Sequence, residues 1–104
     1  MRTIEWTTKF HKDYKRESRG LHRAALDSAL SAVVQLLATD QALQPRQRDH
    51  DLIGDHAGCR ECHIRPDLLL IYRKLDDANS SGKDKAQSGI LRLVRLGSHS
   101  ELFG

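Results

Sequence analysis

The stretch Gly58–Arg73, GCRECHIRPDLLLIYR, decides the fold. Its apolar run from Leu68 to Tyr72 is too short to span a membrane and too dense to be exposed, so it predicts a central strand buried on both faces. Residues 59–64 predict a second strand, and the Pro66-Asp67 pair between the two predicts a tight corner. Together these strands are expected to form a hairpin.

Titratable side chains lie at the mouth of this hairpin. His63 comes shortly before the corner, and Asp67 lies within it. Histidine titrates near neutrality, so a chain with six histidines suits proton transfer or metal binding. A titratable pair on a rigid hairpin is the first place where chemistry is expected.

Before the hairpin, the sequence predicts a short strand and two helices. Residues 3–6 are β-prone, Thr7 or Thr8 offers an N-cap hydroxyl, and a short basic helix then runs until Gly20 breaks it. A second helix is expected from Leu21 to about Thr39, because its leucine and valine positions follow the helical rhythm. These positions are Leu26, Leu30, Val33 and Leu37.

The remaining segments complete a β-α-α-β-β-β order. Residues 40–58 form a polar connection, and residues 76–89 have almost no apolar content and predict a flexible loop. Residues 90–96 predict the last strand, which ends at Gly97. This order indicates an α+β fold in which two helices cover one face of a mainly antiparallel, four-stranded sheet. The other face is then free to hold a site.

The composition bounds the class of protein. A chain of 104 residues is expected to form one domain, residues 1–104, and its 38% hydrophobic and 30% charged residues are typical of a folded protein. No segment is apolar enough to span a membrane and no signal peptide is evident at Met1, so a cytoplasmic location is expected. The net charge of +3 permits a polyanionic partner without requiring one.

The cysteines and neighbouring histidines suggest two further sites. Residues 59–63, CRECH, match the letters of the c-type haem attachment motif, but haem attachment requires export. His56, Cys59, Cys62 and His63 could bind zinc, but a strand would point Cys59 and Cys62 to opposite faces. Neither a metal nor a cofactor is therefore expected, and small strand residues are the better interpretation of both cysteines.

Acid/base catalysis is the third interpretation. Its candidates are His50, His63, Asp67 and His99. They fall at strand ends or on the long connection, and neighbouring strands could bring these ends together. On residue type alone, each could equally be a surface or turn residue.

Three motifs resemble the YafQ branch of the RelE-type toxins. They are Asp49-His50, the pattern GxRxxHIxPDLLLIY from residue 58 to residue 72, and RLGSHSELF from residue 95 to residue 103. The family comprises ribosome-dependent mRNA endonucleases of type II toxin–antitoxin systems. The resemblance implies a RelE-like fold, with an RNA site on the concave side of the sheet. The insertion at residues 76–89 departs from the family pattern.

The resemblance also implies roles for individual residues. His50, His63, Asp67 and His99 are expected to be catalytic, and Phe103 to bind RNA by stacking on a base. His63 is expected to be charged and held by Asp67, although Asp67 could instead be the base. Which of His50 and His99 is the acid stays open.

Arg60 is also expected to bind RNA, although a salt-bridge role is nearly as plausible. An antitoxin, the ribosome and mRNA are the implied partners. The alternatives are a ParE-like toxin acting on gyrase and a binding module without catalysis.

Overall fold

The computed structural model describes residues 1–76 and 89–104 and has an α+β fold. Its strands and helices follow the predicted order, with short additions between residues 39 and 59 and at the end of the described chain. The elements are β1 (Thr3–Trp6), α1 (Thr8–Glu17), α2 (Leu26–Ala38), the 3-10 helix η1 (Pro45–Gln47), β2 (His50–Asp51), the 3-10 helix η2 (Gly54–His56), β3 (Arg60–Arg65), β4 (Leu68–Leu75), β5 (Ile90–Gly97) and α4 (His99–Phe103).

The sheet has the strand order β1-β5-β4-β3-β2. The β1–β5 pair is parallel and the other pairs are antiparallel, so the predicted mainly antiparallel sheet is confirmed. The sheet has five strands instead of four, because the two-residue strand β2 adds to the edge at β3. A strand this short has no periodicity that a sequence could reveal. The β3–β4 hairpin turns at Pro66-Asp67, as predicted.

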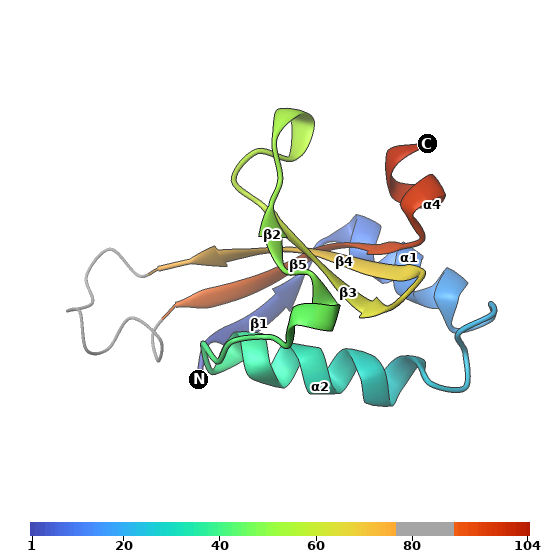
Figure 1. The fold of residues 1–104 in the computed structure, drawn as a ribbon, viewed down its shortest axis with the longest axis horizontal. Coiled ribbons are helices and arrows are strands. Elements are labelled where there is room, and N and C mark those ends of the chain that lie inside the picture. The colour runs from blue at the N-terminus through green and yellow to red at the C-terminus, as the bar shows by residue number, and fades with distance from the viewer. Residues whose placement is uncertain (77–88) are drawn as a thin grey trace.

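The helices α1 and α2 pack on one face of the sheet, and the main core lies between the two layers (Figure 1). The strand β4 contributes Leu68, Leu70 and Tyr72 to this core, while Leu69 and Ile71 are buried on the opposite face. The prediction of a central strand buried on both faces is therefore confirmed.

The boundaries of the two helices agree only in part with the prediction. Thr7 caps α1, because its side-chain oxygen accepts a hydrogen bond of 3.0 Å from the Phe10 N–H. The prediction that α2 begins at Leu21 is wrong, because residues 21–25 form turns. Leu21 is 87% exposed, whereas Leu26 is buried. The buried apolar face of the helix therefore starts at Leu26, and burial does not stabilise a helical turn before it.

The helix α4 and the η2 segment project from the face that α1 and α2 leave uncovered (Figure 1). Leu102 of α4 packs there against Leu69 and Ile71 of β4. The flexible loop predicted for residues 76–89 lies largely outside the described residues. Within the described ranges, no helix has the length and apolar character needed to cross a membrane.

Candidate active site

Two histidines and one glutamate meet on the face of the sheet that carries α4. Glu61 of β3 is opposite His50 of β2 in the strand register, and its Oε1 lies 3.7 Å from Nε2 of His50. The same oxygen lies 4.0 Å from Nε2 of His63, which is two residues further along β3 and so on the same face. The Glu61 side chain is only 7% exposed. A buried carboxylate thus lies between two imidazoles.

The backbone fixes the orientation of the His50 ring. Its Nδ1 lies 2.6 Å from the carbonyl oxygen of Arg48. A carbonyl oxygen can only accept, so Nδ1 donates the hydrogen and Nε2 is left to exchange a proton on the side of Glu61. Arg48 has the left-handed backbone conformation, with a φ of 48°, which is uncommon for a residue with a side chain.

The register of the sheet brings the start of α4 to the same end of the sheet. His63 is opposite Leu69 of β4, and Leu69 is opposite Gly97 of β5. Neighbouring strands lie about 4.8 Å apart, so two such steps separate the Cα atoms of His63 and Gly97 by roughly 10 Å. His99 follows Gly97 by two residues and begins α4.

Three aromatic rings form a second cluster on this face. The ring centroids of His99 and Phe103 are 5.2 Å apart, and the ring of His56 from η2 meets Phe103 edge-on at 5.9 Å. Phe103 thus links α4 to the η2 segment, and it is still 41% exposed. From the sequence, His56 is considered only as a zinc ligand and not as a neighbour of Phe103.

Asp67 and Arg60 are less directly connected to these clusters. Asp67 is exposed in the β3–β4 turn and makes no side-chain hydrogen bond or ion pair within residues 1–76 and 89–104. The carboxylate next to His63, which the sequence analysis assigned to Asp67, is that of Glu61. Alternation along β3 could have indicated Glu61, since residues 61 and 63 share a face.

Arg60 points away from this face and holds the residues on either side of His50. Its guanidinium pairs with Asp49 at 3.2 Å and with Asp51 at 2.6 Å. Asp49 also accepts a hydrogen bond of 2.5 Å from the hydroxyl of Tyr72, a core residue. The Asp49 hydrogen bond raises the pKa of Arg60 above its ordinary value, although partial burial opposes this.

The cysteines are free thiols that do not converge on one point. Cys62 is buried in the core, and burial raises the pKa of its thiol to about 12, so it stays protonated. Cys59 packs on the other face, as strand alternation predicts. Within the described part of the chain, no group of three or more histidine, cysteine, aspartate or glutamate side chains could hold a metal ion.

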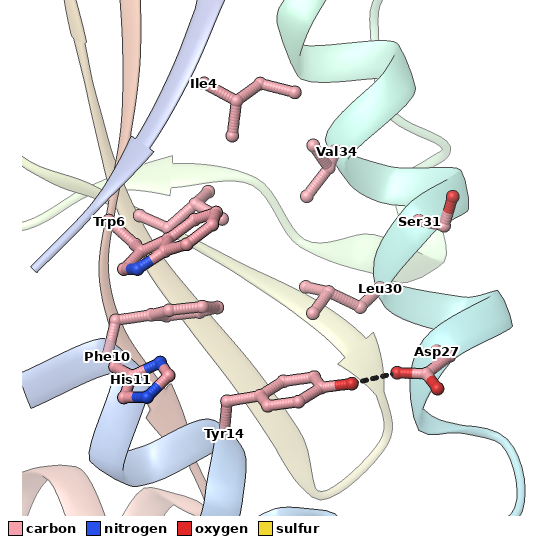
Figure 2. Close-up of a pocket in the computed structure, with 10 residues that line it drawn as sticks. Ile4, Trp6, Phe10, His11, Tyr14, Asp27, Leu30, Ser31 and Val34 are labelled. Carbon is pink, nitrogen blue, oxygen red and sulfur yellow. Dashed lines mark hydrogen bonds between the residues drawn. The ribbon is translucent and has the colours of Figure 1, made fainter.

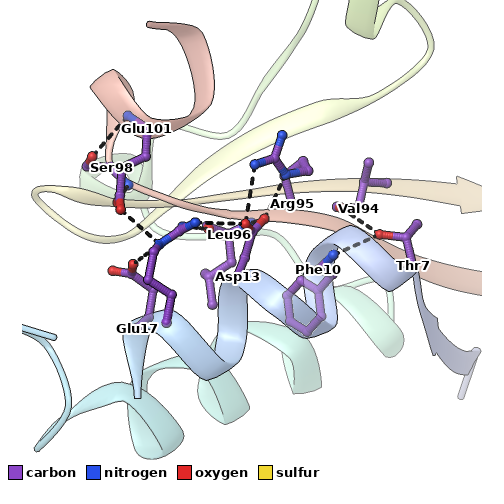
Figure 3. A network of polar contacts seen from close by, with 10 residues as sticks. Thr7, Phe10, Asp13, Glu17, Val94, Arg95, Leu96, Ser98 and Glu101 are labelled. Carbon is purple, nitrogen blue, oxygen red and sulfur yellow. Dashed lines mark hydrogen bonds and ion pairs between the residues drawn. The ribbon is translucent and has the colours of Figure 1, made fainter. Parts of the chain in front are cut away.

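A network of charged groups fixes the end of β5 and the start of α4 (Figure 3). Arg16 of α1 donates to the carbonyl oxygen of Leu96 at 2.9 Å and pairs with Glu101 of α4 at 2.8 Å. Glu101 and Ser98 form a capping box at the beginning of α4. The backbone hydrogen bond from Ser98 is the main reason why the pKa of Glu101 lies below its ordinary value. Arg16 therefore anchors the helix that carries His99.

Gly97 leaves room for this anchor, so Gly97→Ala should reduce activity more than stability. A Cβ atom at residue 97 would lie 2.8 Å from Nη2 of Arg16, closer than real Cβ contacts allow. The guanidinium would have to move, which would loosen α4. Exposed ion pairs contribute little stability, so we expect a loss of about 1 kcal/mol or less. A shift of about 1 Å in a catalytic group can lower a rate up to about 10²-fold.

The matched control for this prediction is Gly20→Ala. A Cβ atom there would have its nearest neighbour at 3.6 Å, an ordinary van der Waals distance. Urea unfolding and the rate of the RNA cleavage that the resemblance implies would be measured on both variants. Equal cleavage by Gly97→Ala and the unchanged protein would show that α4 does not depend on Arg16.

A separate apolar cavity of about 500 Å³ lies on the helix side of the sheet (Figure 2). It is bordered by β1, α1 and α2, and Trp6 at its rim is 60% exposed. The hydroxyl of Tyr14 donates a hydrogen bond to Asp27 across one side. Its lining shares no residue with either cluster described above.

Comparison with known proteins places the chain in a family. The family described as "Bacterial toxin of type II toxin-antitoxin system, YafQ" matches residues 2–104. The chain belongs to the YafQ family. Its similarity to the mRNA interferase toxin YafQ of Escherichia coli K12 is 31% identity over 104 residues, or 99% of this chain and 97% of that protein.

Solved structures of similar proteins have the same fold as this YafQ-family chain. A copper-bound mutant toxin from Helicobacter pylori is 37% identical, with a TM-score of 0.74 over 99% of this chain and 100% of the other. The E. coli DinJ–YafQ complex contains a chain that is 28% identical, with a TM-score of 0.70 and full coverage of both chains. The RelE-like fold implied by the sequence resemblance is thereby confirmed.

Proposed function

We propose that this protein is a ribosome-dependent mRNA endonuclease, the toxin of a type II toxin–antitoxin system, and that it inhibits translation. The observation that carries the proposal is the convergence of His50, Glu61 and His63 beside the helix that begins with His99. Membership of the YafQ family, and the name mRNA interferase given to its relatives, support the same reaction. These names also favour RNA cleavage over the gyrase-directed alternative.

The proposed reaction uses the ribose 2′-hydroxyl as the nucleophile and needs no metal ion. The 2′-oxygen bonds to phosphorus while the bond from phosphorus to the 5′-oxygen of the next nucleotide breaks. One group takes the proton of the 2′-hydroxyl, and another gives a proton to the departing 5′-oxygen. The products are a 2′,3′-cyclic phosphate and a 5′-hydroxyl. DNA has no 2′-hydroxyl and would not react.

The two proton transfers need two groups that can each take up and release a proton near neutral pH, which is the property of histidine. We assign them to His50 and His99, with either direction of transfer open, and each transfer contributes typically about 10²–10⁴-fold. His63 would stabilise the phosphate as an imidazolium, with Glu61 as its buried counter-charge. Glu61 is a further candidate for the base, since it also lies beside Nε2 of His50. Asp67, which the resemblance assigns a catalytic role as the partner of His63 or as the base, is exposed in the β3–β4 turn.

Two RNA-binding roles complete the proposal. The exposed part of the Phe103 ring offers a surface for a nucleobase, and base stacking of this kind contributes about 1–3 kcal/mol. Arg60 would act mainly by holding Asp49 and Asp51, and this would fix the position of His50 between them. The sequence predicted a direct contact between Arg60 and the RNA, and this contact is proposed as a second role. The partner is an antitoxin, in line with the complex of the E. coli relative with DinJ.

Mapping transcript ends tests the reaction. The purified protein would be added to a message in a translation system and, separately, to the same message without ribosomes. The cleaved ends from the two reactions would be compared. We expect cleavage only with ribosomes, leaving 5′-hydroxyl and cyclic-phosphate ends. Glu61→Gln should reduce cleavage about 10²-fold or more. Ends carrying a 5′-phosphate would contradict the 2′-hydroxyl mechanism, and intact message would contradict the proposed function.

A further inference from the structure

A basic groove of about 560 Å³ opens beside His63. It lies between η1 and the β3–β4 hairpin. The side chains that matter for its charge are Arg46 and Arg48 from the η1 segment and Arg65 from the end of β3, and Gln47, Ile64 and Pro66 complete the lining together with His63.

The three arginines of the groove differ from five other arginines of the chain in having no ion-pair partner among the described residues. Five arginines elsewhere have a carboxylate partner within 4 Å, and these are Arg2, Arg16, Arg60, Arg92 and Arg95. Arg46, Arg48 and Arg65 make no ion pair within residues 1–76 and 89–104. All three are exposed, so three uncompensated charges line one groove.

The groove is continuous with the candidate active site through two residues. His63 lines the groove and also faces Glu61 at 4.0 Å. Arg48 also lines the groove, and its carbonyl oxygen accepts the hydrogen bond from His50. The left-handed backbone of Arg48 costs about 1–2 kcal/mol.

We propose that this groove binds the phosphodiester backbone of the mRNA strand next to the bond that is cut. The planar guanidinium of arginine matches the geometry of phosphate oxygens, and three of them in a row suit a strand with one charge per nucleotide. The groove then fixes the register of the strand, while the histidine clusters act on the neighbouring phosphate. The proposal extends the proposed function, since it takes the ligand to be the same RNA.

The salt dependence of RNA binding tests the groove without requiring cleavage. The probe is a single-stranded RNA oligonucleotide with 2′-O-methyl groups throughout, which cannot react. The variant replaces Arg46, Arg48 and Arg65 with glutamine. Each phosphate contact on a single strand contributes about 0.7 to the slope of log K against log salt, so three contacts should lower the slope by about 2.

The matched control removes the same charge from another surface. Lys12, Arg19 and Arg23 are exposed on or after α1, away from the groove, and their replacement with glutamine also lowers the net charge by three. The control should keep the slope of the unchanged protein. Equal slopes for the groove variant, the control and the unchanged protein would overturn the proposal.

A second arm separates the message from ribosomal RNA, which carries the same phosphate chemistry. Ribosomes without message would be titrated with the same three proteins. Loss of oligonucleotide binding in the groove variant supports the message as ligand. If the groove variant loses binding to empty ribosomes but keeps binding to the oligonucleotide, the assignment of the groove to the message is overturned. If the unchanged protein binds the oligonucleotide through the groove but cuts no message, the endonuclease function fails and the groove stands.

Discussion

His99→Ala should lower the rate of message cleavage by about 10²–10⁴-fold, the range for loss of a group that transfers a proton in the transition state. His99 is the first residue of α4, it is exposed, and its one described ring contact is with Phe103. An aromatic contact of this kind contributes about 1 kcal/mol, so folding should be almost unaffected. Single-turnover cleavage on ribosomes and thermal unfolding would measure the two effects separately.

The matched control is His11→Ala. His11 is also exposed, but it lies on α1 and lines the apolar cavity on the other side of the sheet. This variant should cleave message at the unchanged rate. If His99→Ala also cleaves at that rate, His99 has no place in the mechanism, and proton transfer must be sought among His50, Glu61 and His63.

The sequence predicted the parts of the fold that depend on periodicity. The run from Leu68 to Ile71 has no polar residue, as expected for a strand covered on both faces. The stripe from Leu26 to Leu37 follows one face of a helix, and that face is buried in the structure. Helix propensity alone does not set the start of α2, because Leu21 is free to face solvent when no neighbouring element covers it.

The parts that were missed depend on pairing between distant segments. Glu61 becomes the partner of His50 only because β2 adds to the edge of β3, and two residues carry no recognisable strand pattern. The final helix α4 did have a signal, since Ser98 and Glu101 have the spacing of a capping box. The basic groove needed the position of η1 against the hairpin, which no local pattern indicates.

Asp13→Ala should have the largest effect on stability, a loss of about 3 kcal/mol in the free energy of unfolding. Its carboxylate is 4% exposed and accepts hydrogen bonds from Arg95 Nε at 2.7 Å and from the Leu96 N–H at 3.0 Å (Figure 3). Arg16 contacts it at 3.0 Å. Breaking a buried ion pair costs about 3–5 kcal/mol, and the lower end applies because Arg95 keeps some contact with water.

Glu5→Ala is the matched control for the loss of a carboxylate–arginine pair. Glu5 pairs with Arg92 at 2.6 Å, but their side chains are 41% and 39% exposed. Exposed pairs contribute about 1 kcal/mol or less, so this variant should unfold close to the midpoint of the unchanged protein. Urea unfolding monitored by circular dichroism measures both variants. A similar small loss for both would mean that burial of Asp13 adds nothing.

The pH dependence gives an independent check on Asp13. Burial alone would raise the pKa of its carboxyl, but the hydrogen bonds from Arg95 and Leu96 and the charges of Arg95 and Arg16 outweigh burial and lower that pKa below its ordinary value. A group with a lowered folded-state pKa contributes its full stability above its unfolded value of about 3.9 and loses it as the pH falls through the folded-state value. Asp13→Asn should therefore lose less stability than the unchanged protein as the pH falls from neutral into the acid range.

Because Leu96 directly precedes Gly97, the carboxylate of Asp13 also holds the strand end from which α4 and His99 begin. Acid-induced weakening of this contact should consequently reduce the ordering of α4 before the rest of the sheet unfolds, which hydrogen exchange at the α4 amides would detect.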